Sequence, residues 1–68
     1  MSKQETKFEV TRRFGTRVQT QTVVVTKEGD GWVARCAALG VGRAYPDPLA
    51  AATELALDNG YPEVTLVA

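Results

Sequence analysis

The sequence has no histidine, a single cysteine and no long apolar run. Without an imidazole, the chain cannot build a Ser–His or Cys–His catalytic pair or a histidine metal site. The lone cysteine, Cys36, rules out a disulfide within the chain. No segment approaches the roughly 20 apolar residues of a membrane-spanning helix, and residues 1–6 lack the apolar core of a signal peptide. These absences favour a cytoplasmic protein that does not use imidazole chemistry.

The chain of 68 residues is long enough for one domain and no more. A fold of this size buries only about 60% of its unfolded surface, so association with a second copy is the expected supplement to its stability. The net charge is zero, but residues 1–27 carry six basic and two acidic side chains, and residues 28–68 carry two basic and six acidic ones. That asymmetry suits an anionic partner, an oppositely charged copy, or solvated charged faces.

Apolar alternation and turn residues predict a flexible tail over residues 1–6 and a single α+β domain over residues 7–68. We expect a three- to four-stranded antiparallel sheet packed on one helix, with strands before the helix and one strand after it. The strands are predicted at residues 7–14, 16–27, 32–37, 41–45 and 63–68. The first of these is expected to be a short edge strand.

The segment 28–31, Glu-Gly-Asp-Gly, supplies the residues that a tight hairpin turn requires. Reversal there places Val25 opposite Ala34, with Cys36 further along the same face, and we assign this face to the core. Val24 and Arg35 then lie on the opposite face of the sheet.

The helix is predicted over residues 48–59. Asp47 is a suitable N-cap, Pro48 suits the first helical position, and Gly60 suits a left-handed C-cap. The apolar stripe of this helix spans about 200°, wider than a core-facing stripe needs. One flank, which includes Leu57, is therefore available to a partner.

The remaining polar residues do not form a catalytic set. Glu54 and Asp58 are four residues apart on one helix face, where like charges point to solvent. Cys36 is expected to be a buried structural thiol. Gly40 and Gly42 lack the third glycine and the following helix of a phosphate-binding loop. We expect no enzyme activity, no cofactor and no metal site.

Two sets of residues are candidates for binding. Partner-binding residues are predicted on the open sheet face, beside the turn and on the helix flank: Val24, Arg35, Trp32 and Leu57. The alternative is a nucleic-acid site in which basic and aromatic side chains alternate: Arg12, Arg13, Phe14 and Arg17. A charged strand that resists edge-to-edge pairing would show the same basic residues.

The segment 23–36, VVVTKEGDGWVARC, resembles the opening of HicB-family antitoxin domains, in which an apolar strand enters an acidic glycine turn and an aromatic residue follows. Residues 37–40, AALG, and 48–52, PLAAA, correspond to the loop and the helix start of that family. The resemblance covers about residues 22–60. The Pro-Asp-Leu-Pro-Gly loop and the separate DNA-binding segment of full-length members have no counterpart here.

The resemblance implies a partner-binding domain of a toxin–antitoxin system, whose partner would be a toxin. Together with the residues, it leads us to expect a non-enzymatic protein-interaction module that forms a homo-oligomer. The alternative expectation is a small nucleic-acid-binding module that uses the basic N-terminal half.

Overall fold

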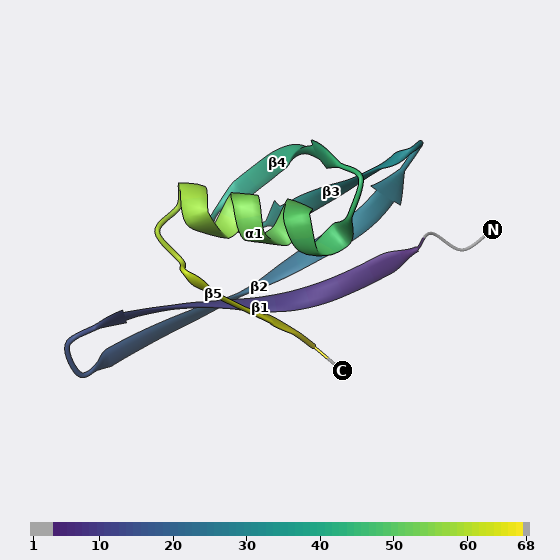
Figure 1. Ribbon diagram of the computed structural model, residues 1–68. Coiled ribbons are helices and arrows are strands. Elements are labelled where there is room, and N and C mark those ends of the chain that lie inside the picture. The colour runs from purple at the N-terminus through teal and green to yellow at the C-terminus, as the bar shows by residue number, and fades with distance from the viewer. Residues whose placement is uncertain (1–3, 68) are drawn as a thin grey trace.

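The computed structural model describes residues 4–67 as a five-stranded antiparallel sheet with one helix across one face (Figure 1). The α+β class predicted from the sequence is confirmed. In chain order the elements are β1 (Glu5–Phe14), β2 (Arg17–Glu28), β3 (Gly31–Cys36), β4 (Gly40–Tyr45), α1 (Pro48–Asp58) and β5 (Glu63–Leu66).

The sheet has the strand order β4-β3-β2-β1-β5. The first four strands form a meander of consecutive hairpins, and β5 returns to pair with β1, where Phe8 lies opposite Leu66. The predicted position of the first strand was therefore wrong: β1 lies between β2 and β5. The sheet has five strands, one more than the three to four expected, because all five predicted segments pair in it, and ten residues of β1 pair with β2.

The start of β1 lies earlier than predicted. Glu5 pairs with Thr26 and Thr6 pairs with Val25, so both belong to the sheet and not to a tail. Their polar side chains hid this pairing, which depends on backbone hydrogen bonds. The predicted tail residues 1–3 and the last residue of the predicted final strand, 68, lie outside the described residues.

Two tight turns fix the hairpin registers. The β1–β2 turn has Gly15 at its first position with φ +56°, and the β2–β3 turn has Gly29 with φ +62°. Glycine at the first position of a two-residue loop is typical of a type II′ turn, whose twist matches that of paired strands. As predicted, Val25 lies opposite Ala34, and Lys27 lies opposite Trp32.

The helix begins and ends close to the predicted residues. The Asp47 carboxylate accepts a hydrogen bond from the Ala50 amide at 2.9 Å, which caps the N-terminus. Asn59 is the C-cap, and Gly60 follows with φ +81°. The Gly60 conformation returns the chain toward the sheet, where Tyr61 is buried.

The core lies between α1 and one face of the sheet. Its buried residues are Phe8, Val10, Val23, Val25, Ala34, Cys36, Ala51, Ala52, Leu55, Ala56 and Tyr61. Three of the four buried helix residues are alanines, which lets α1 lie close to the strands. The prediction that Cys36 is part of the core is confirmed.

Candidate interaction surfaces

The open face of the sheet, on the side away from α1, carries a cluster of small apolar side chains. We call it the valine patch: Val24, Val33, Val41 and Ala44, which surround Arg35. Within the sheet, Arg35 lies opposite Val24 on β2 and opposite Val41 on β4. Val24 and Val33 are half-buried, whereas Val41 and Ala44 are exposed.

Arg35 is held in place at the centre of the patch. Its guanidinium forms an ion pair with Glu28 and donates a hydrogen bond to the Thr26 hydroxyl at 3.0 Å. The Thr26 hydroxyl in turn donates to Glu28 at 3.0 Å. The hydrogen bond to Glu28 raises the pKa of Arg35 above its ordinary value. The patch therefore has a fixed charged centre within an apolar rim.

The predicted partner-binding residues do not share one surface. Val24 and Arg35 are neighbours on the open face, as expected. Trp32 lies on the helix side, half-buried against the core, with the Lys27 ammonium 5.9 Å from its ring centroid. Leu57 is exposed on α1, so it too is separated from the valine patch by the sheet.

The predicted nucleic-acid residues come together on an arm. We use that name for residues 12–19, the end of the β1–β2 hairpin, where β1 and β2 pair only with each other. The arm projects beyond the helix and the other strands (Figure 1). It contains three arginines and no acidic residue.

Arg12 connects the arm to the core. Its guanidinium carbon lies 4.6 Å from the centroid of the Tyr61 ring and 4.9 Å from that of Phe14. Its Nε donates a hydrogen bond to the Gln19 carboxamide oxygen at 2.5 Å, across the hairpin. Tyr61 is buried, whereas 58% of Phe14 is exposed. The cation thus bridges a buried ring and an exposed one.

Arg13 points to the other face of the arm. It forms an ion pair with Glu63 of β5, with an Nε–Oε2 distance of 2.7 Å. The hydrogen bond lowers the pKa of Glu63 and raises that of Arg13. Arg17, opposite Phe14 in the register, forms no ion pair or side-chain hydrogen bond with another described residue.

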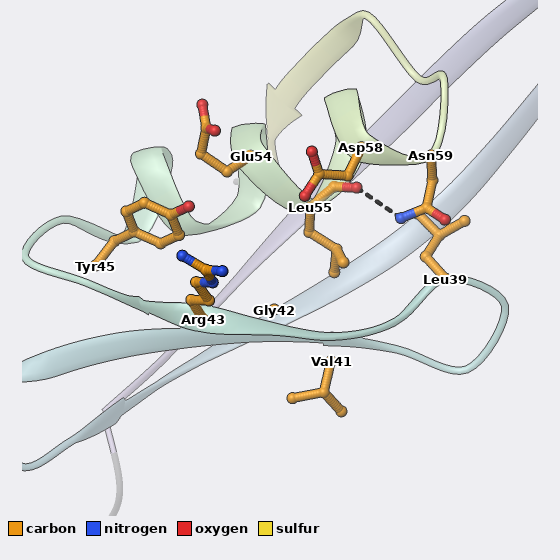
Figure 2. A pocket seen from close by; sticks show the side chains of 9 residues that line it. All are labelled: Leu39, Val41, Gly42, Arg43, Tyr45, Glu54, Leu55, Asp58 and Asn59. Carbon is orange, nitrogen blue, oxygen red and sulfur yellow. Dashed lines mark hydrogen bonds between the residues drawn. The ribbon is translucent and has the colours of Figure 1, made fainter.

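A groove of about 600 Å³ lies between α1 and β4 (Figure 2). Arg43 and Tyr45 point into it from the strand, Leu55 points down from the helix, and Val41 points to the opposite face. Glu54 and Asp58 line the helix side.

A β-bulge produces this arrangement. Between the pairs Val33–Ala44 and Arg35–Val41, β4 has one residue more than β3. The extra residue interrupts the alternation, so Val41 lies on the open face although it is only two residues from Arg43, which lies on the helix side. The sequence analysis missed the groove, and the only sequence signal was the pair of glycines that flank Val41.

The chain matches no known protein family, no curated protein and no solved structure. Within residues 4–67, no three Cys, Asp or Glu side chains are grouped so that they could hold a metal ion. The single described helix is too short and polar to cross a membrane.

Proposed function

We propose that this chain is a non-enzymatic, cytoplasmic protein-interaction module that self-associates through the open face of its sheet. The observation that carries the proposal is the valine patch, a group of apolar side chains on a sheet face that no described element covers. Contiguous apolar groups on a small domain are typical of association surfaces.

A second copy of the chain is the occupant that the charges of this face favour. The register places three basic and four acidic residues on the open face: Lys7, Arg13, Arg35, Glu5, Glu9, Glu28 and Glu63. Because both signs are present on one surface, two copies related by a two-fold axis can place opposite charges against each other.

The size of the domain supports the same occupant. Among the buried core residues within residues 4–67, only three have side chains larger than valine: Phe8, Leu55 and Tyr61. Burial of the patch in a dimer would add apolar area that the monomer lacks, at about 25 cal/mol per Å². The hairpin resemblance to HicB-family partner-binding domains is consistent with a protein partner at this face.

Sedimentation equilibrium at micromolar to millimolar protein concentration tests the proposal. The variant Val24→Thr/Val41→Thr keeps the shape and the strand preference of the patch but removes one methyl group at each position. A symmetric dimer buries four such methyl groups, each contributing about 0.8 kcal/mol. The dissociation constant of the dimer should therefore rise at least about tenfold in this variant.

The matched control is Leu49→Ser/Leu57→Ser, because both leucines are 52% exposed and lie on α1, away from the open face. It should dissociate like the unaltered protein. A strict monomer at every concentration, or an equal effect of the helix control, would contradict self-association through the valine patch.

A further inference from the structure

We propose that the arm, residues 12–19, binds single-stranded nucleic acid, with its arginines on the phosphates and Phe14 stacked on a base. This function goes beyond self-association and uses a different part of the molecule, because the valine patch is formed by β2, β3 and β4 outside the arm.

The charge of the arm supplies the phosphate contacts. Arg12, Arg13 and Arg17 lie within six residues, and the nearest acidic residues in sequence are Glu9 and Glu28. Glu63 is the one acidic side chain that contacts an arm arginine among residues 4–67. A protein of zero net charge therefore concentrates positive charge at one projecting end, where a polyanion can approach (Figure 1).

The stacking arrangement favours an unpaired base. Tyr61, Arg12 and Phe14 form a continuous series of ring, guanidinium plane and ring, and Phe14 is its exposed end. An exposed aromatic ring beside phosphate-binding cations is the combination that single-strand-binding proteins use, because every base offers a π-face. A nucleobase on Phe14 would extend the series by one member, and Arg17 lies directly opposite Phe14 to hold the adjoining phosphate.

The faces of the arm disfavour an anionic membrane as the ligand. The register puts Phe14 on the face of the arm that continues the helix side of the sheet, whereas Val18, opposite Arg13, is on the other face. Insertion into a flat lipid surface requires apolar side chains on one side and cations around them. Here apolar and cationic groups occur on both sides, which suits a flexible strand that can wrap around the arm.

Fluorescence anisotropy with a labelled single-stranded oligonucleotide of mixed sequence tests the proposal, with the same sequence as a duplex and anionic vesicles as the other probes. The single strand should bind most tightly. With two or three phosphates neutralised, the slope of log K against log salt should lie between about −1.4 and −2.1. A tenfold rise in salt should then weaken binding roughly thirty- to hundredfold.

Two charge-matched variants locate the site. Arg12→Gln/Arg13→Gln/Arg17→Gln should abolish the salt-dependent binding, whereas Lys7→Gln/Lys27→Gln/Arg43→Gln removes the same charge elsewhere and should change it less than about threefold. Phe14→Leu should weaken binding of the single strand about tenfold and leave duplex binding unchanged. Circular dichroism of each variant establishes that it is folded.

Four results would overturn the proposal. The first is no binding of the single strand at low salt, and the second is an equal loss of affinity in the two triple variants. The third is equal affinity for the single strand and the duplex, with neither affinity changed by Phe14→Leu. The fourth is tighter binding to vesicles than to the oligonucleotide. The Phe14→Leu variant should still self-associate, because Phe14 lies on the helix side and not on the open face, so failure of the nucleic-acid proposal and failure of the proposed function are distinguishable.

Discussion

The same two strands, β1 and β2, build two unlike regions. In the body of the domain their inward side chains, Val10 and Val23, are fully buried beneath α1. Two residues further along β1 the inward position is Arg12, and from there the hairpin continues without a helix above it. Strand pairing is continuous across both regions, so the layer that covers a strand, and not the pairing itself, separates the core from the arm.

A pair of truncations should show the largest difference between the two regions. Leu55→Ala removes the buried leucine that joins α1 to the sheet and should cost about 2–5 kcal/mol of unfolding free energy. Val18→Ala, in the arm, alters a side chain that is 54% exposed and should stay within about 0.5 kcal/mol. Urea unfolding followed by circular dichroism measures both, and equal losses would show that the arm is part of the core.

The two type II′ turns allow a sharper test, because the same change is made at equivalent positions. Alanine at a positive φ costs roughly 1–2 kcal/mol. Gly29→Ala, between β2 and β3, should lower global stability by about that amount. Gly15→Ala, at the tip of the arm, should lower it by less, because local opening of the arm relieves the strain.

Amide hydrogen exchange supplies the second measurement for this pair. In the Gly15→Ala protein, faster exchange should be confined to the arm, and amides of Val23 and Val25 should keep their protection. If protection falls throughout the sheet, the arm and the body unfold as one unit and the distinction between them fails.

Capping and turn chemistry explains why much of the fold could be predicted. Asp47, Pro48 and Gly60 act on their nearest neighbours, so the helix bounds followed from local sequence. The place of β1 depends on its pairing with β5, which joins Phe8 to Leu66 across nearly the whole chain, and no local pattern encodes that contact.

The contact between Arg12 and Tyr61 joins the two regions and should contribute a smaller amount. A double-mutant cycle with Arg12→Met and Tyr61→Leu isolates it, since the cycle cancels the lost packing of each residue alone. A guanidinium over an aromatic ring predicts a coupling of about 0.5–1 kcal/mol. Additive effects in urea unfolding would mean that the contact between Arg12 and Tyr61 does not couple the arm to the core.

The ion pair between Arg13 and Glu63 should give the smallest effect, because both side chains are exposed to solvent. Its hydrogen bond lowers the pKa of Glu63 below the ordinary value of 4.5, so the folded state binds the proton less readily than the unfolded state. The resulting stability is present above about pH 4.5 and is lost as the pH falls through the lower folded-state pKa.

Glu63→Gln should remove this acid-side slope by slightly lowering the stability near neutral pH, where the ion pair contributes, while leaving the stability in acid unchanged. Thermal unfolding at a series of pH values from neutral to well below 4.5 detects it, with Glu9→Gln on β1 as the control. A slope that persists in Glu63→Gln would assign it to another carboxylate.

The candidate surfaces could be predicted only in part, for related reasons. The alternation of Arg12, Arg13, Phe14 and Arg17 was visible in the sequence because all four lie in one hairpin. Tyr61, which completes the stack, comes from beyond the helix, so only the folded chain reveals it. The groove likewise needs the β4 bulge, which reverses the side-chain alternation on which a strand prediction relies.

The pairing of β5 with β1 has a consequence for how the chain could be reconnected. The Val67 amide donates a hydrogen bond to the Lys7 carbonyl at 3.0 Å, so the first and last strands run side by side to the same end of the sheet. The tip of the arm, at Gly15 and Thr16, lies at the other end of β1. A circular permutant that opens the chain at this tip and links the original ends would preserve every strand pair, and it would convert the arm from a closed hairpin into two free strand ends.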